Sequence, residues 1–320
     1  MIEKYDHKTL VEVFDGQAVS PILPYDSIDA DVATIKASTQ ASGRISISGV
    51  QPKYAMVIDN GFLRFAHEGE QGRYILKIAP IEPHIMERPW VPVNEWLTMH
   101  IAEQVYGIPT AKNTLCFFRN GSVAYVTKRF DVQADGTKWL QEDFASIANI
   151  SKDTNGADYK YNALSYADCG TLIDKYVSAA MVEKLKFFRI VLFNYLTCND
   201  DAHLKNFSLT SPSGKDYRLT PAYDLLNTYL HLANPHIFAL TKGLYPRMVI
   251  DDTHPVTGKS FEEFGRLLGL PTKLVASELG FFRAEKPQAK ELILASGLLE
   301  ELAQHYFAVF DYRRKTLSFD

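Results

Sequence analysis

One stretch of the chain, residues 178–198, would be apolar nearly all round as a helix. Its apolar side chains leave no polar stripe to face water: Val182, Leu185, Phe187, Phe188, Ile190, Val191, Leu192, Phe193, Tyr195 and Leu196. A helix that is apolar all round is buried inside a large domain. The most apolar run, 187–196, is too short to cross a membrane and holds Arg189 and Asn194. We therefore expect a central buried helix in a sizeable lobe.

The part of the chain before this helix is typical of a sheet. Strand-like runs bounded by turn signals fall at residues 45–48, 54–59, 73–78, 115–118 and 123–126. Apolar residues fall at helical spacing over 94–106, with Asn94 as N-cap and Gly107 as stop signal. This pattern predicts a small antiparallel sheet with one helix.

The part of the chain after residue 130 is mostly helical. Amphipathic stretches occur near 261–269, 272–284 and 288–311, the first with a capping box of Ser260 and Glu263. A sheet-rich lobe (1–130) followed by a helical lobe (131–320) predicts a bilobal α+β architecture.

Composition limits the classes of function. A net charge of −4 and a pI near 6.2 argue against direct nucleic-acid binding as the main task, which needs clustered Lys and Arg. We expect contact with DNA only through a partner. There is no signal-peptide pattern, polybasic cluster or amphipathic anchor, so we expect a cytoplasmic protein without membrane contact. Cys116, Cys169 and Cys198 form no CxxC pair, which favours reduced thiols over disulfides or zinc.

A polar loop, residues 199–206, follows the buried helix directly. It reads Asn-Asp-Asp-Ala-His-Leu-Lys-Asn and leads into a strand at 207–210, a turn, and a second strand at 217–219. A hairpin of this kind returns Asp224 to the neighbourhood of the loop. Such a run taken alone is also typical of a solvated turn with an Asx cap. Three carboxylates and a His held centrally would instead need a metal or another partner.

Phosphoryl transfer needs the groups that this arrangement supplies. The attacking hydroxyl must be oriented and deprotonated, and oxygen ligands must hold the Mg²⁺ that bridges the phosphates. Asp201 is the candidate base, and Asn206 and Asp224 are the candidate Mg²⁺ ligands. The spacing from Asp201 to Asn206 matches the HRDxxxxN loop of protein kinases. His203 is expected to brace the loop, and Lys205 either approaches the transferred phosphate or pairs with a nearby carboxylate.

These residues resemble the motif series of HipA-type toxin kinases. The other motifs are Ser46 to Lys53, Tyr74 to Lys77, Asn94 to Trp96 and Arg129 to Asp131, in the family's order across residues 44–230. The resemblance implies a serine/threonine kinase that uses ATP and Mg²⁺. It further implies that the kinase phosphorylates an aminoacyl-tRNA synthetase, stalls translation and is restrained by a DNA-binding HipB-like antitoxin.

The resemblance also implies ATP contacts. The candidates are Ser48, Gly49, Val50, Gln51, Lys53, Lys77, Glu95, Lys128 and Phe130. Lys77 would contact the α and β phosphates and pair with Glu95. From the residues alone, Lys77 could equally be a solvent-facing charge on an edge strand. Glu95 could equally be an acidic residue in the first turn of a helix, favoured there by the helix dipole. Lys128 stands where the family has Glu. The adenine would therefore be contacted by the backbone and by Phe130.

The phosphate-loop segment holds two candidate autophosphorylation sites. Ser46 and Ser48 are expected on one face of a strand, where they could also simply face solvent. A phosphate there would place nearly two negative charges beside the ATP phosphates and favour expulsion of the loop.

The expected partners follow from the resemblance as well. Only some 44 residues precede the loop, so the chain resembles the short toxin HipT. In the systems that contain HipT, a small HipS-like protein supplies the missing N-terminal subdomain. The target there is tryptophanyl-tRNA synthetase. Two other functions stay open: a small-molecule or lipid kinase, because the same framework serves those enzymes, and a silent pseudokinase acting in assembly.

Overall fold

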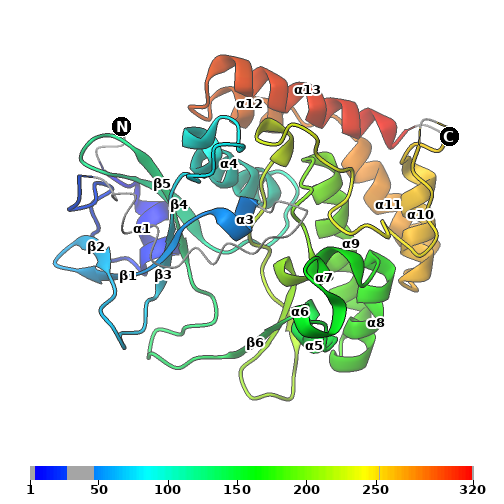
Figure 1. The fold of residues 1–320 in the computed structure, drawn as a ribbon, viewed down its shortest axis with the longest axis horizontal. Helices are drawn as coiled ribbons and strands as arrows, with labels where there is room; N and C mark the ends of the chain where they lie inside the picture. The colour runs from blue at the N-terminus through cyan, green and yellow to red at the C-terminus, as the bar shows by residue number, and fades with distance from the viewer. Residues whose placement is uncertain (1–3, 27–46, 252, 319–320) are drawn as a thin grey trace.

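The chain folds into a sheet-rich part and a larger helical part (Figure 1). The computed structural model describes residues 4–26, 47–251 and 253–318. The first sheet is antiparallel, in the order β2-β1-β3-β5-β4. Its strands are β1 (Lys53–Asp59), β2 (Phe62–Phe65), β3 (Tyr74–Lys77), β4 (Asn113–Phe117) and β5 (Val123–Lys128). Four of the five predicted strands are confirmed, all but the one expected at 45–48, and β2 is an additional edge strand.

Different helices cover the two faces of this sheet. They are α1 (His7–Phe14) and α4 (Val91–Gln104), both of which contact β4 and β5. Successive side chains of a strand point to opposite faces. Accordingly, Val126 of β5 packs in a core with Phe14 of α1, whereas its neighbour Tyr125 belongs to the core that contains α4.

The predicted buried helix is α9 (Ala180–Leu196). Its side chains from Phe187 to Leu196 are buried except Arg189, whereas Val182, expected to be buried with them, is 55% exposed. Beside it lies a second antiparallel sheet in the order β6-β7-β8. Its strands are β6 (Leu140–Asp143), β7 (Ser208–Ser211) and β8 (Arg218–Leu219). The two strands of the predicted hairpin are thus confirmed, and β6 joins them from earlier in the chain.

The remaining helices surround α9 and reach back to α4. The longer ones are α8 (Tyr166–Tyr176), α10 (Gly258–Leu267), α11 (Thr272–Arg283), α12 (Pro287–Leu294) and α13 (Glu300–Thr316). The short ones are α3 (Ile47–Val50), α5 (Phe144–Ile147), α6 (Lys152–Asn155), α7 (Tyr159–Asn162), η1 (Arg88–Trp90), η2 (Leu204–Asn206) and η3 (Thr228–Leu230). α13 contacts α9, and α12 contacts α4. No helix in the described ranges combines the length and apolarity needed to span a bilayer.

Three expectations about local structure are wrong. Residues 47–50 form helix α3 rather than the end of a strand, because a four-residue alternation is too short to distinguish the two. Asn94 is not an N-cap, since the helix begins at Val91, with Pro92 suited to its first turn. Ser260 forms its capping box with Thr257, not with Glu263, which pairs with Arg266.

The expected helix at 288–311 is two helices, α12 and α13. Gly297 lies between them with φ +83°, in the left-handed region that favours glycine. Cys116, Cys169 and Cys198 are free and buried, as expected of reduced thiols.

Candidate active site

The loop that follows α9 is buried. Asn199, Asp200, Asp201 and His203 are each less than 5% exposed. The interpretation of this segment as a solvated turn is therefore wrong. Asp200 anchors the loop to later residues, since its Oδ2 accepts a hydrogen bond from the backbone N–H of His236.

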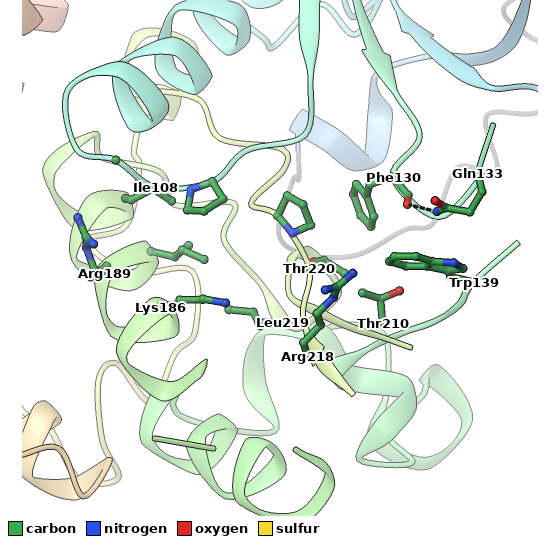
Figure 2. A pocket seen from close by; sticks show the side chains of 14 residues that line it. Ile108, Phe130, Gln133, Trp139, Lys186, Arg189, Thr210, Arg218, Leu219 and Thr220 are labelled. Atoms are coloured by element: carbon green, nitrogen blue, oxygen red, sulfur yellow. Dashed lines mark hydrogen bonds between the residues drawn. The ribbon is translucent and has the colours of Figure 1, made fainter. Parts of the chain in front are cut away.

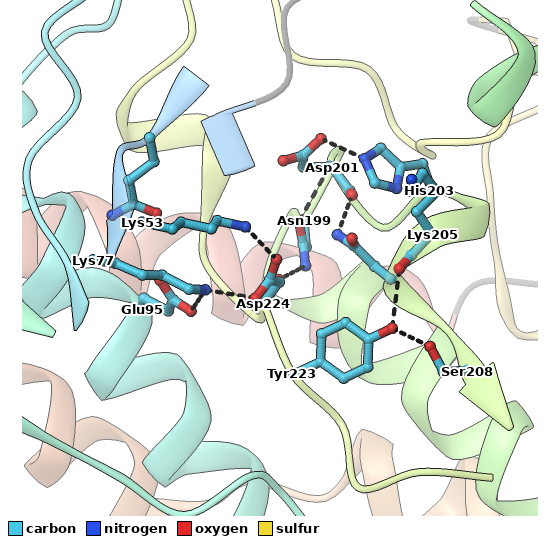
Figure 3. Close-up of polar contacts among 12 residues, drawn as sticks. Lys53, Lys77, Glu95, Asn199, Asp201, His203, Lys205, Ser208, Tyr223 and Asp224 are labelled. Carbon is cyan, nitrogen blue, oxygen red and sulfur yellow. Dashed lines mark hydrogen bonds and ion pairs between the residues drawn. The ribbon is translucent and has the colours of Figure 1, made fainter. Parts of the chain in front are cut away.

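Asn199 connects the backbones of the two candidate aspartates, Asp201 and Asp224. Its Oδ1 accepts a hydrogen bond from Asp201 N (3.1 Å), and its Nδ2 donates to the backbone oxygen of Asp224 (3.2 Å). Figure 3 shows Asn199 between Asp201 and Asp224. The backbones of both aspartates are thus fixed to one amide, which keeps them in the same site.

Asp224 lies between two lysines. Its Oδ1 is 2.5 Å from Lys77 Nζ, and its Oδ2 is 3.4 Å from Lys53 Nζ (Figure 3). The Asp224 backbone has φ +55°, a conformation that costs a non-glycine residue free energy and is concentrated at functional sites. The surrounding contacts therefore hold this carboxylate in a position that its local sequence does not favour.

Lys77 also forms an ion pair with Glu95 of α4, as the family resemblance implies. Because β3 lies between β1 and β5, Lys77 is on an interior strand, and its interpretation as an edge-strand charge is wrong. Burial alone would lower the pKa of Lys77, but Asp224 and Glu95 outweigh it and raise the pKa. Lys77 is therefore a charged ammonium group held between two carboxylates.

Asp201 is oriented by a tyrosine from a distant segment. Tyr161 Oη donates to Asp201 Oδ1 at 3.1 Å, and His203 Nε2 lies 3.8 Å from the same oxygen. Burial lowers the pKa of His203 to about 4, despite the attraction of Asp201. His203 is thus uncharged at neutral pH, and its ring packs edge-on against Tyr161 with centroids 5.2 Å apart. This placement agrees with a bracing role.

Asn206 is tied to the loop in a way that directs its amide. Its Nδ2 donates to the backbone oxygen of Asp201 at 2.7 Å. The amide oxygen of Asn206 and the carboxylate of Asp224 are hard oxygen donors, the kind that Mg²⁺ prefers. In the part of the chain that the structure describes, no cluster of three or more His, Cys, Asp or Glu could hold a metal. Asn206 and Asp224 thus offer oxygen donors suited to a Mg²⁺ that nucleotide phosphates and water would also coordinate.

Lys205 and Tyr223 lie at the other side of the loop. Lys205 Nζ is 3.8 Å from Asp143 Oδ2, so the salt bridge foreseen as one alternative exists as a loose pair. Tyr223 Oη donates to the backbone oxygen of Lys205 at 3.0 Å and contacts Ser208 Oγ at 2.6 Å. Tyr223 thereby joins the loop to β7 one residue before Asp224.

The candidate phosphate loop is only partly described. Gln51 donates from its Nε2 to the backbone oxygen of Ile78, beside Lys77, and Gly49 is exposed. Ser46 lies outside the described residues, as do the side chains of Ser48 and Val50. The two serines were expected on one strand, but Ser48 lies in helix α3.

The segment after β5 is fixed by charge pairs. Lys128 pairs with Asp15, which follows α1, and Arg129 forms two hydrogen bonds with Asp131. The ring of Phe130 lies 5.8 Å from that of Tyr223, measured between centroids. Phe130 is thus near the candidate site, while the side chain of Lys128 is held by Asp15.

Sequence reasoning missed one group of residues that positions α4. Asn94 accepts a hydrogen bond at Oδ1 from Asn227 N (3.0 Å), and its Nδ2 donates to Asn227 O (2.8 Å). The same Nδ2 contacts His231 Nε2 at 2.8 Å. Tyr161, Asn199 and Tyr223 also had no assigned role; Asn199 and Tyr223 could have been suspected because they adjoin the candidate aspartates.

Comparison with solved structures identifies the fold. The fold is kinase-like: 88% of the chain superimposes on 68% of HipA from the Shewanella oneidensis MR-1 complex of HipA, HipB and operator DNA, with a TM-score of 0.65 and 24% identity. It also superimposes on the Helicobacter pylori proinflammatory kinase CtkA, with a TM-score of 0.50 and 15% identity, covering 82% of this chain and 87% of CtkA.

The family follows from the sequence match. The HipA-like C-terminal domain matches residues 45–285, and the chain belongs to this family. A "Putative kinase" of Haemophilus influenzae is 27% identical over 86% of this chain and 81% of its own length. The serine/threonine-protein kinase toxin HipA of Shewanella oneidensis is 27% identical over 81% of this chain and 59% of its own length. The chain is thus homologous to kinases that include a HipA toxin.

Proposed function

We propose that this chain is a toxin serine/threonine protein kinase that transfers the γ-phosphate of ATP to a protein hydroxyl. The observation that carries the proposal is the shared fixation of Asp201 and Asp224 by Asn199, with Lys77 joined to Asp224. This geometry supports the proposal, because phosphoryl transfer would need a base, a metal-binding carboxylate and a phosphate-binding lysine held in one site.

Each residue has a chemical role in the proposal. Asp201 accepts the proton of the attacking hydroxyl, whose oxygen forms a bond to the γ-phosphorus as the bond to the β-γ bridging oxygen breaks and ADP leaves. Lys77 contacts the α and β phosphates. Asn206 and Asp224 would hold Mg²⁺, which would neutralise the charge that develops on the phosphate. The backbone near residue 130 would hold the adenine at the boundary between the two lobes.

The finer part of the proposal concerns substrate and partners. The motif resemblance favours an aminoacyl-tRNA synthetase as substrate, with tryptophanyl-tRNA synthetase first, and autophosphorylation at Ser46 or Ser48. It also favours a HipT-like toxin with a HipB-like antitoxin and a small HipS-like partner. The solved relative from Shewanella oneidensis is itself in complex with HipB and operator DNA.

The test separates binding from transfer. Purified wild type and the variants Asp201→Asn and Asp224→Asn are incubated with γ-labelled ATP, Mg²⁺ and a panel of synthetases. We expect wild type to label one synthetase, Asp201→Asn to bind ATP with Mg²⁺ but not transfer, and Asp224→Asn to lose Mg²⁺-dependent binding. Equal labelling by wild type and Asp201→Asn would reject the base. ATP binding with no labelled protein, but with labelled lipid or small molecules, would favour the alternative kinase class.

A further inference from the structure

A cavity of about 380 Å³ lies between four segments of the chain. Its walls are residues 107–109 after α4, the segment from 130 to 139, helix α9, and the hairpin of β7 and β8 with the residues that follow (Figure 2). This volume lies in the range of small-molecule sites. Lys77, Asp201, Asn206 and Asp224 do not line it, but Phe130, the candidate adenine contact, does. The cavity therefore adjoins the candidate active site without containing its catalytic or metal-binding groups.

The cavity lining is apolar with a positive edge. Ile108, Phe130, Ile190 and Leu219 form apolar walls, and the lining contains Lys and Arg but no Asp or Glu. Arg218 lies beside Trp139, with its guanidinium carbon 4.9 Å from the ring centroid (Figure 2). A flat apolar body with one anionic group complements such a lining.

The three cations of the lining differ in what they already contact. Lys186 pairs with Glu183, and Arg189 lies 3.4 Å from Glu278. Arg218 forms no ion pair with a carboxylate of the described chain, and its residue is exposed. Arg218, held against Trp139, is therefore the group best suited to receive the anion.

The cavity wall is linked to the candidate Mg²⁺ ligand. Pro109 and Pro221 both line the cavity. Ala222 N donates to Pro109 O at 2.8 Å, and Ala222 O accepts from Ala111 N at 2.9 Å. Asp224 follows two residues after Ala222. A ligand pressing on the two prolines would shift the strand-like contact that leads directly to Asp224.

We propose that this cavity binds a small organic anion with a flat aromatic body, and that its occupancy changes the affinity for Mg²⁺-ATP through the segment from Pro221 to Asp224. The binding step stands independently of kinase activity. The effect on nucleotide affinity rests on the proposed function.

The test uses two probes that differ by one charge. Isothermal titration calorimetry measures the affinity of 8-anilinonaphthalene-1-sulfonate and of its uncharged counterpart N-phenyl-1-naphthylamine for the wild type and for Arg218→Gln. We expect one site, with the sulfonate binding about tenfold tighter in wild type and the preference lost in Arg218→Gln. Arg119→Gln, a matched change at an exposed arginine that does not line the cavity, should keep the preference.

Two further variants test the location. Ile190→Trp fills the cavity and should abolish binding of both probes; Trp139→Ala, at a partly exposed position, should weaken both without unfolding the protein, which thermal melting checks. Binding should persist in saturating AMP-PNP with Mg²⁺ while nucleotide affinity shifts. Unchanged binding in both variants, or complete displacement by AMP-PNP, would overturn the separate site. Probe binding as expected without any phosphoryl transfer would reject the kinase proposal alone.

Discussion

Lys77 Nζ lies 2.5 Å from Asp224 Oδ1 while also pairing with Glu95, so one ammonium group joins the sheet, helix α4 and the segment after the hairpin. Both carboxylates are largely or fully buried: the side chain of Glu95 is 2% exposed and that of Asp224 12%. Two carboxylates this close to each other are stable only with the cation between them. Lys77 is thus both a candidate phosphate ligand and a structural centre.

Replacing Lys77 tests this double role. Lys77→Met should lower the free energy of unfolding by about 3–5 kcal/mol, because it leaves the buried Glu95 without the cation it pairs with and leaves Asp224 with only Lys53. The double variant with Glu95→Met should regain much of that stability but no phosphoryl transfer. Chemical denaturation and a labelled-ATP assay measure both. Lys112→Met is the control: this half-exposed lysine pairs with Glu103 and Glu12, and its loss should cost about 1 kcal/mol or less.

Asn94 fixes α4, and with it Glu95, to the chain that follows Asp224. Asn94→Asp keeps the shape of the side chain but replaces the donors to Asn227 O and His231 Nε2 by an oxygen. We expect a loss of about 1–3 kcal/mol for each buried acceptor left without its donor. Nucleotide affinity should fall because Glu95 is no longer held against Lys77.

The measurement for Asn94→Asp is thermal unfolding together with ATP titration. Asn155→Asp, the same change at an exposed position in α6, is the control and should alter neither quantity. A variant at position 94 that melts and binds ATP like the wild type would show that the hydrogen bonds to Asn227 do not position the helix.

His231 should make stability depend on pH. Burial lowers its pKa to about 4, although its ring is hydrogen-bonded to Met86 O. The unfolded chain takes up this proton near pH 6.5, so between pH 6.5 and 4 the unfolded state binds more protons than the folded state. The contribution is complete above pH 6.5 and is lost as pH falls toward 4, amounting to up to about 3 kcal/mol.

Comparing wild type with His231→Gln isolates this contribution. Urea denaturation at several pH values between 7 and 4 should show a shallower loss of stability in the variant. Buried His203, whose pKa is also lowered to about 4 by burial, remains in both proteins and contributes equally to each. Parallel curves for the two proteins would contradict the neutral, buried state of His231.

Local patterns in the sequence were enough to predict α9 and the order loop, hairpin and Asp224. An apolar surface on all sides has only one stable environment, and a polar loop between buried elements is forced into the interior. The pairing of Lys77 with Glu95 came from the family resemblance, because the local sequence of neither residue excludes a surface charge.

Other parts of the site depend on contacts that no local pattern encodes. Tyr161 reaches Asp201 from 40 positions earlier in the chain, and Asn94 reaches Asn227 from 133 positions earlier. Asn94 also shows how a good N-cap residue can be used differently: buried inside α4, its amide bonds to another segment. Such partners are set by tertiary packing, which propensity and spacing do not contain.

Replacing Lys205 distinguishes its two possible roles, contact with the transferred phosphate and a salt bridge with Asp143. Its side chain is 46% exposed and its pair with Asp143 is long, so the salt bridge itself should contribute about 1 kcal/mol or less to stability. We expect Lys205→Met to leave unfolding nearly unchanged but to reduce the rate of phosphoryl transfer about 100-fold, because a cation facing the transferred phosphate stabilises charge in the transition state. Asp143→Asn is the matched variant: it removes the same ion pair, while Asn can still cap α5 as Asp143 does by accepting from Ser146 N. Transfer that persists in Asp143→Asn but fails in Lys205→Met places the lysine at the phosphate; equal losses in the two variants would assign it to the salt bridge instead.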